Sequence, residues 1–299
     1  MVNIKRKQIG TKTYYYLEHT FREGKTTKRK EIYLGKEIPN EIETIKKEFV
    51  NKIYQDKWYG QLDQIKKNCT KELLATPKAA REKEKETFAV KFTYNTQRIE
   101  GSTLTLRETA DLLEKGITPK NKPIRDAKEA ETHRAVFYEV LEYKKELSLQ
   151  ITLYWHKKLF EQTKIEIAGK IRAHQVAISG SRFLPPSPIE VDFLLREFFE
   201  WYHQHKNTVH PVELAALVHL KFVTIHPFSD GNGRMSRLLM NFGLNKHRYP
   251  LMDIPYEKRT GYYNALERSQ IKKDATIFIQ WFFRRYIKEH KRFAGKRLL

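Results

Sequence analysis

The chain has 299 residues and 40% hydrophobic content, enough for one well-cored domain and a small second unit. Its single cysteine, Cys69, excludes an internal disulfide framework and a cysteine-based zinc site. No apolar run is long enough for a membrane span or a signal-peptide core, so we expect a cytoplasmic protein with no membrane contact. The formal net charge of +21 favours anionic partners, which include nucleotides, nucleic acid and acidic proteins.

The first predicted unit is a small antiparallel sheet over residues 4–35. The segment 12–17 consists largely of threonine and tyrosine, which suit a pleated surface, and Pro39 ends the unit. Residues 1–36 hold ten Lys and Arg against three Glu, so the sheet is basic. From Glu41 to Lys67 apolar side chains recur at a helical period, which predicts a connecting helix.

From Thr76 onward the pattern is mainly helical. Pro77 suits a first helical residue, because no amide hydrogen is needed there, and this helix should run to about Ile99. Thr105 and Glu108 have the spacing of a capping box for the next helix. Further helices are expected at residues 124–147, 149–161, 188–204, 211–224 and 275–290, the last one capped by Asp274.

One segment between these helices, residues 169–187, departs from the helical pattern. Its residues 176–183 suggest a β-hairpin that turns at Gly180, and Pro185 and Pro186 close it. The predicted fold class is therefore mainly α, with a β-hairpin within a helical bundle and a small antiparallel β-subdomain before it.

His226 directly follows the helix expected at 211–224, which is apolar nearly all round and should be buried. Pro227 stops that helix, so the histidine is held rigidly at its end. The ordinary pKa of histidine lies near neutrality, which suits a general base for a hydroxyl nucleophile. A single histidine after a helix is more often structural than catalytic, so the assignment depends on its neighbours.

The residues after His226 strengthen the assignment. The loop Gly231-Asn232-Gly233 leads into a helix expected to begin near Arg234, and such a loop with a helix N-terminus binds a di- or triphosphate. Asp230 is acidic inside a site for anions, which favours a Mg²⁺ ligand there. Arg234 and Arg237 lie three residues apart, so both guanidinium groups can bind phosphates from one side of the helix.

The stretch HPFSDGNGRMSR, from His226 to Arg237, resembles the defining motif of the Fic (filamentation induced by cAMP) family, with every fixed position present. The resemblance implies AMPylation, the transfer of AMP from ATP to a protein hydroxyl with release of pyrophosphate. The roles that it implies are a base at His226, a Mg²⁺ ligand at Asp230, contacts to the α- and β-phosphates from Asn232 and the amides around Gly231 and Gly233, a contact to the phosphate chain from Arg234, and a contact to the γ-phosphate from Arg237.

The resemblance extends over about residues 80–290 and leaves the N-terminal sheet out. Residues 169–186 resemble the Fic flap, which aligns an incoming target segment by strand pairing. Residues 262–266 resemble the stretch that lines the adenosine side, so Tyr263 and Asn264 are weaker candidates for ATP binding. An aromatic pair on a helix is more often part of the core. His156 and His219 are expected to be structural.

A second family motif, Ser/Thr-x-x-x-Glu-Gly/Asn, is similar to the stretch from Thr96 to Gly101 and implies an inhibitory helix. The Glu100 carboxylate would then form a bidentate ion pair with Arg237, which could not hold the γ-phosphate. The alternative is that Glu100 is only the last-turn residue of a helix that Gly101 ends. In some family members this glutamate instead positions the water that removes AMP, so de-AMPylation also fits.

We therefore expect an auto-inhibited protein adenylyltransferase with Mg²⁺ as cofactor and ATP as co-substrate. Its predicted parts are a basic β-subdomain at 1–40, a connecting helix at 41–75 and a Fic-like catalytic domain at 76–299. The target is an unidentified protein, which includes the chain itself, and members of the family often form homodimers. Two alternatives stay open. One is a Fic-type phosphotransferase, against which the intact Gly-Asn-Gly loop argues, and the other is a nucleic-acid-associated regulator that uses the basic sheet.

Overall fold

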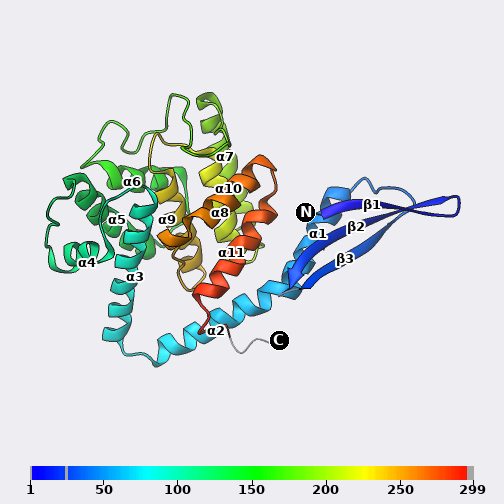
Figure 1. The fold of residues 1–299 in the computed structure, drawn as a ribbon, viewed down its shortest axis with the longest axis horizontal. Helices are drawn as coiled ribbons and strands as arrows, with labels where there is room; N and C mark the ends of the chain where they lie inside the picture. The colour runs from blue at the N-terminus through cyan, green and yellow to red at the C-terminus, as the bar shows by residue number, and fades with distance from the viewer. Residues whose placement is uncertain (1, 24–25, 295–299) are drawn as a thin grey trace. The chain divides into compact units, whose positions relative to one another are not determined.

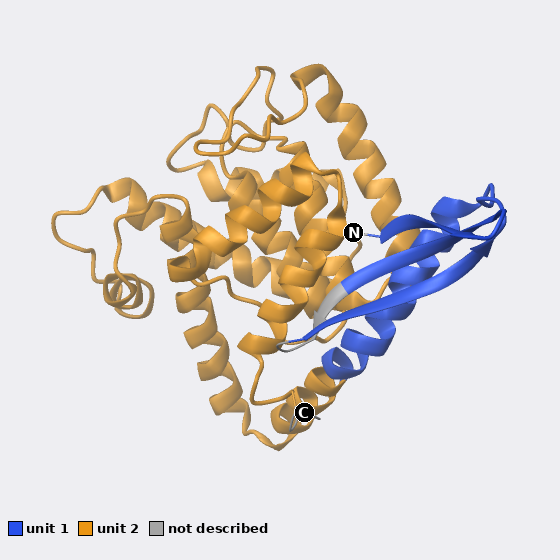
Figure 2. Cartoon of the chain, turned by 45° about the vertical axis from the view of Figure 1, so that its right-hand side comes forward, with its two compact units in different colours: residues 1–63 blue, residues 64–299 orange. Residues whose placement is uncertain are grey.

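The computed structural model describes residues 2–23 and 26–294, and the chain divides into two compact units, residues 1–63 and 64–299 (Figure 2). The smaller unit contains the sheet, and the larger unit contains most of the helices. The boundary between the units falls inside the helix predicted for residues 41–75. The division into three parts stays a prediction.

The N-terminal unit is a three-stranded antiparallel sheet with the strand order β1 (Val2–Ile9), β2 (Lys12–Glu23) and β3 (Thr26–Gly35) (Figure 1). Leu17 of β2 is aligned with Ile4 on one side and with Ile32 on the other. It is fully buried in a cluster with Phe49 and Ile53 of α1 (Ile42–Tyr54). The predicted sheet is confirmed, and α1 covers its apolar face.

The predicted connecting helix is also present, but it is not α-helical throughout. After α1, residues Gln55–Tyr59 form a π-helical turn, and α2 (Gly60–Ala75) continues from it. A π-helical turn adds one residue to the helical repeat, which rotates the following side chains around the helix axis. Trp58 within this turn is buried. The apolar period alone did not predict this change of repeat.

The larger unit is helical, as predicted. Its α-helices are α3 (Lys78–Ile99), α4 (Leu106–Lys115), α5 (Ile124–Glu142), α6 (Leu149–Phe160), α7 (Pro188–His205), α8 (Pro211–Ile225), α9 (Asn232–Lys246), α10 (Arg259–Ile271) and α11 (Ala275–Glu289). Thr105 and Glu108 form the predicted capping box, and Asp274 caps α11 by accepting a hydrogen bond from the Thr276 amide at 3.0 Å. Within the described residues, no helix combines the length and apolar character that a membrane crossing needs.

Two helix ends differ from the prediction. Pro77 is the residue before α3 rather than its first residue, and its ψ of 148° is extended. Helix α5 ends at Glu142 instead of continuing to residue 147, because Tyr143 turns the chain with a ψ of 118°. Leu147, which was expected in that helix, is fully buried in the core after the turn. Both differences leave the order of the helices as predicted.

The core of the larger unit is centred on α8 and α9, which pack along each other (Figure 1). Leu214 and Phe222 of α8 lie in one buried cluster with Leu238 and Phe242 of α9. The burial of α8 on nearly every side agrees with its apolar sequence. The loop that joins these helices, residues 226–231, is therefore fixed at both ends by buried elements. This loop begins the predicted motif.

The segment predicted as a β-hairpin has the expected turn but no strands. Residues 169–187 are all described, and none of them forms a strand. The chain turns at Gly180, where the amide of Ser181 donates to the carbonyl oxygen of Ile178 at 3.0 Å. The predicted strands are wrong, because amides of the outgoing arm bond to side chains instead of to the facing arm. The Arg182 amide donates to Glu267 Oε1 at 2.7 Å, and the Phe183 amide donates to Ser181 Oγ at 3.1 Å. We refer to residues 169–187 as the flap segment.

Candidate active site

His226 ends α8 in a left-handed backbone conformation, with φ 53° and ψ 57°. Such a conformation is uncommon outside glycine, and its surroundings must hold it. The ring Nδ1 lies 3.1 Å from the carbonyl oxygen of Val223, which can only accept, so Nδ1 carries the proton and Nε2 keeps its lone pair. Burial lowers the pKa of His226, which favours the neutral ring. Both features prepare Nε2 to accept a proton.

Arg172 holds the backbone of this histidine. Its Nε donates to the carbonyl oxygen of His226 at 2.7 Å, and its amide nitrogen donates to the carbonyl oxygen of Pro227 at 3.0 Å. Its other guanidinium nitrogens donate to the carbonyl oxygens of His174 at 3.0 Å and Pro186 at 2.6 Å. The residue is 3% exposed, and its side-chain hydrogen bonds within the described chain all go to backbone carbonyl groups. Arg172 thus joins both ends of the flap segment to the candidate base.

His156 supports the loop from α6. Its Nδ1 accepts a hydrogen bond from the Gly169 amide at 2.9 Å, so the proton is on Nε2, which donates to the carbonyl oxygen of Asp230 at 3.0 Å. The ring stacks on Phe228 with 3.6 Å between the ring centroids. Burial lowers the pKa of His156 to about 4, so the ring is neutral at physiological pH. This role is structural, as predicted.

The glycine loop begins α9 at Asn232, two residues before the predicted start at Arg234, with Gly231 at φ 84° as the preceding residue. A Cβ at Gly231 would overlap the ring of Phe160, so the close approach requires glycine. The buried Asn232 side chain donates to the carbonyl oxygen of Phe228 at 2.8 Å and accepts from its amide at 2.9 Å. Asn232 therefore closes the loop, and the amides in the first turn of α9 make this end of the helix a candidate anion site.

The carboxylate of Glu100 lies in this anion site. Arg237 donates through Nη2 to Glu100 Oε1 at 2.6 Å, so the contact uses one carboxylate oxygen rather than the expected bidentate pair. A Cβ at Gly233 would overlap Glu100 Oε1, so the carboxylate lies directly against the first turn of α9. Arg237 is 1% exposed and also donates to Thr96, through Nε to Oγ1 at 3.3 Å. Burial alone would lower the pKa of Arg237, but Glu100 raises it above its ordinary value.

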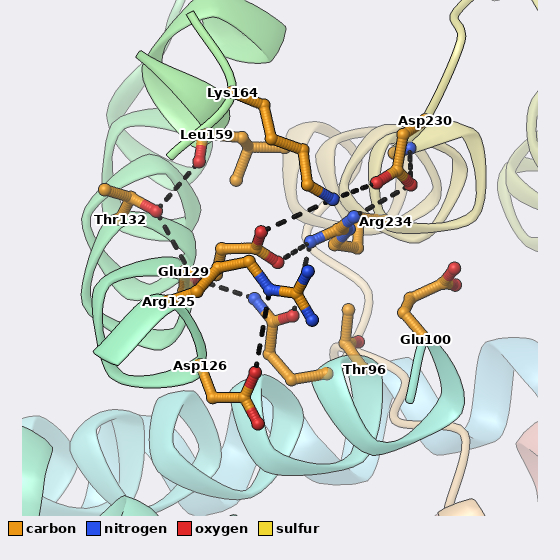
Figure 3. Close-up of polar contacts among 12 residues, drawn as sticks. Thr96, Glu100, Arg125, Asp126, Glu129, Thr132, Leu159, Lys164, Asp230 and Arg234 are labelled. Atoms are coloured by element: carbon orange, nitrogen blue, oxygen red, sulfur yellow. Dashed lines mark hydrogen bonds and ion pairs between the residues drawn. The ribbon is translucent and has the colours of Figure 1, made fainter. Parts of the chain in front are cut away.

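Asp230 and Arg234 belong to a ring of four alternating charges, completed by Glu129 of α5 and Lys164 (Figure 3). Arg234 donates through Nη2 to Asp230 Oδ1 at 3.0 Å and through Nη1 to Glu129 Oε2. Lys164 Nζ bonds to Asp230 Oδ2 and lies 3.6 Å from Glu129 Oε1. Burial would raise the pKa of Asp230, but Arg234 and Lys164 hold it well below its ordinary value. Asp230 is therefore an anion with two cationic neighbours.

The two weaker candidates from the sequence, Tyr263 and Asn264, are exposed on α10. The Tyr263 hydroxyl donates to the carbonyl oxygen of Ile99 at 3.0 Å, which joins α10 to the end of α3. The neighbouring Tyr262 is buried, and its hydroxyl lies 2.9 Å from His219 Nε2. His219 is fully buried, and burial lowers its pKa well below the ordinary value, which fits the predicted structural role.

Sequence reasoning did not find three residues of the site: Arg172, Glu129 and Lys164. Arg172 lies in the segment that resembles the Fic flap, so that resemblance was the available signal. Glu129 and Lys164 stand among the 31% of residues that are charged, and no motif marks them. They are identified only in the folded structure, where α5 and the chain after α6 lie close to Asp230 and Arg234 (Figure 3).

The region that is similar to known proteins includes the stretch from His226 to Arg237. The sequence profile of the Fic/DOC family matches residues 146–244. The chain is 36% identical over 178 residues to the protein adenylyltransferase Fic of Drosophila ananassae, and 35% identical over 178 residues to that of Drosophila melanogaster. Each match covers 58% of this chain, and 35% and 36% of the two relatives, respectively. The chain thus spans little more than a third of the length of these relatives.

Solved structures extend the likeness over most of the larger unit. A Fic-domain-containing signaling protein from Bacteroides thetaiotaomicron matches with a TM-score of 0.70 and 26% identity, covering 77% of this chain and 95% of that chain. Fic-1 from C. elegans also matches with a TM-score of 0.70, at 27% identity, covering 85% of this chain and 76% of that chain. These matches confirm the predicted fold class.

Proposed function

We propose that this chain, which carries a domain of the Fic/DOC family over residues 146–244, is a protein adenylyltransferase that is inhibited by its own Glu100. The observation that carries the proposal is the Glu100 carboxylate at the first turn of α9, 2.6 Å from Arg237 Nη2. An anion already lies where a helix N-terminus and a buried arginine favour one. The phosphates of ATP are the expected occupant once Glu100 leaves.

In the proposed reaction His226 Nε2 takes the proton from a hydroxyl group of the target protein. The hydroxyl oxygen forms a bond to the α-phosphorus of ATP, and the bond from that phosphorus to the β-phosphate oxygen breaks. Pyrophosphate leaves with the bonding electrons, and AMP stays on the target. The backbone amides at Gly231 and Gly233 and the Arg237 guanidinium would hold the phosphates. Arg234 would also bind the phosphates if it exchanged its ion pair with Asp230 or Glu129 for one with a phosphate group.

Asp230 is the residue that would hold Mg²⁺. Among the described residues, no three His, Cys, Asp or Glu side chains come together in a way that could bind a metal ion. A single carboxylate fits Mg²⁺ all the same, because this ion keeps several waters and shares its coordination with substrate phosphates. When bound, the ion would neutralise charge on the phosphates. The half-buried Asp230 carboxylate beside the start of α9 has the oxygen donors for this role.

The predicted partners and the predicted cellular location of the protein await experimental tests. A protein target, which includes the chain itself, a homodimer and a cytoplasmic location are expectations from the sequence. Contacts of Tyr263 and Asn264 with the adenosine are proposals of the same kind. A de-AMPylating activity would use Glu100 to position water, and the partial exposure of its side chain, 26%, is compatible with that role.

Nucleic-acid binding by the N-terminal unit is a second candidate function. The rings of Tyr14 and Tyr16 lie 6.2 Å and 5.2 Å from that of Tyr33 on one face of the sheet, and Lys7 Nζ lies 4.1 Å over Tyr16. Such a mixture of rings and cations can stack bases and bind phosphates. Glu31 pairs with Lys7 at 2.8 Å, which reduces the positive charge. Binding of the full chain to generic DNA or RNA with a steep salt dependence would support this function.

The test of the main proposal is mass spectrometry of the full chain after incubation with ATP and Mg²⁺. We expect an adduct with the mass of AMP on the protein, weak in the wild type and strong in the Glu100→Gly variant. An adduct with the mass of a phosphate would instead support the phosphotransferase. The absence of any adduct in both proteins, with and without an added protein extract as target, would contradict the proposal.

Replacing Arg172 with lysine is expected to lower kcat on the order of 100-fold, because a displacement of about 1 Å in a reacting group has effects of this size. Lysine keeps the charge, but one ammonium group replaces a guanidinium whose three nitrogens bind three carbonyl groups. The KM for ATP should change little, since the anion site on α9 is untouched. The control is Arg182→Lys, in the same segment with an 86% exposed side chain. Equal kcat values for the two variants would contradict the role.

A further inference from the structure

The ammonium group of Lys164 lies at the carboxylate that is proposed to bind Mg²⁺. Nζ bonds to Asp230 Oδ2, while Asp230 Oδ1 is bonded by Arg234 Nη2 at 3.0 Å. Lys164 belongs to the turn after α6, where its amide donates to the carbonyl oxygen of Phe160 at 2.8 Å. Its side chain is 23% exposed, so the protein does not enclose it on all sides. An ammonium group at Oδ2 weakens the binding of a metal ion to the same oxygen, because the two positive charges repel each other.

Glu129 offers Lys164 a second position. Within the described part of the chain, Glu129 Oε1 is buried and receives no hydrogen bond, whereas Glu129 Oε2 is bonded by Arg234. A buried carboxylate oxygen without a donor is costly, so a second donor is expected to approach it in some state of the protein. Lys164 Nζ lies 3.6 Å from this oxygen, which is beyond hydrogen-bond distance but within reach of a small rotation (Figure 3).

We propose that Lys164 occupies the metal position at Asp230 when the site is empty and moves onto Glu129 Oε1 when Mg²⁺ and nucleotide bind. This inference rests on the proposed function, because it needs a nucleotide-bound cation at Asp230. The two carboxylates and two cations of the ring give it no net charge, so the charges of these four side chains balance one another. At Asp230 the metal ion replaces the ammonium group as the cation. Lys164 gives up its ion pair with Asp230, keeps the one with Glu129 and gains a hydrogen bond to Glu129 Oε1.

One consequence concerns affinity. Because Lys164 competes with the metal ion, removal of its charge should strengthen metal binding to the nucleotide complex. Nucleotide binding without metal should not change, because the phosphates are held by the amides of α9 and by Arg237. A lysine that instead acts as a phosphate ligand would give the opposite pair of results, since its loss would weaken nucleotide binding. The two roles are therefore separable by binding measurements alone.

The experiment measures Mn²⁺ binding by electron paramagnetic resonance, with a non-hydrolysable ATP analogue, in the full chain carrying Glu100→Gly. We expect Lys164→Met to tighten Mn²⁺ binding by roughly tenfold, because a like charge beside the ion is removed. Isothermal titration with the analogue in a chelator measures nucleotide affinity without metal. The matched control is Lys158→Met, which removes a lysine of α6 that pairs with Glu161 at 3.2 Å. It should leave both affinities unchanged.

Each outcome has a defined meaning. Unchanged or weaker Mn²⁺ binding in Lys164→Met, with wild-type nucleotide affinity, overturns the inference and leaves the proposed function intact. Weaker nucleotide binding in the chelator also overturns it, because Lys164 would then be a phosphate ligand. A chain that binds no nucleotide in any variant overturns the proposed function, and the inference with it. Circular dichroism melting of each variant confirms that the fold is retained.

Discussion

The Glu100→Gly variant is expected to AMPylate roughly 10- to 150-fold faster than the wild type, since a hydrogen bond to a charged group contributes about 1.5–3 kcal/mol. The structure shows what the substitution removes. Glu100 Oε1 lies 2.6 Å from Arg237 Nη2 and against the backbone of Gly233, so the carboxylate occupies both parts of the proposed phosphate site. Initial rates with labelled ATP and Mg²⁺ measure the effect.

The Glu100→Gln variant is the matched control, because it removes the charge but keeps the size and one acceptor oxygen. Its rate should lie between those of the wild type and Glu100→Gly, since the neutral amide still bonds to Arg237 but competes less well with phosphates. Removal of AMP from a previously modified protein should fall in both variants if Glu100 also positions water. Equal AMPylation rates in all three proteins would show that Glu100 only ends α3 and does not inhibit the reaction.

Much of the fold could be predicted because local rules and packing agree there. The apolar sequence of α8, the capping box at Thr105 and the cap at Asp274 each correspond to the observed element. The incorrect predictions concern places where a single backbone torsion angle or a single amide hydrogen bond determines the local structure. Tyr143 ends α5 through its ψ angle. In the flap segment the amides of Arg182 and Phe183 bond to side chains, which the residue pattern alone does not reveal.

The residues of the site could be predicted only where a continuous sequence motif marks them. His226 to Arg237 is one continuous motif, and Glu100 was found because a second motif marks it. Arg172 and Lys164 contact the loop through the tertiary fold, 54 and 66 residues away from their partners in the chain. The charge of Asp230 suggested a metal, but its actual neighbours are cations of the protein. Arg234 lies four residues further along the chain, whereas no spacing rule reveals Lys164.

Replacing His226 with alanine is expected to lower kcat/KM by on the order of 10²–10⁴, the usual contribution of a general base. The backbone there has φ 53°, so alanine adds strain to the loss of the base. His226→Asn separates the two effects, because asparagine tolerates this conformation and still lacks a base of suitable pKa. Both variants should be inactive to a similar degree in rate assays, while the exposed His203→Ala keeps the wild-type rate. Activity in His226→Asn near that of the wild type would contradict the role of the base.

The pH dependence of kcat/KM provides an independent test of the same residue. Burial lowers the pKa of His226, and the charge of Glu100 partly offsets this by raising it. A base must be unprotonated, so activity should fall as the pH drops through this lowered pKa, at a pH below the ordinary value of about 6.5. In Glu100→Gly the raising contribution is absent, so the acid limb should move to still lower pH. A limb that moves upward, or one at an unshifted histidine pKa in both proteins, would contradict the assignment of His226 as the base.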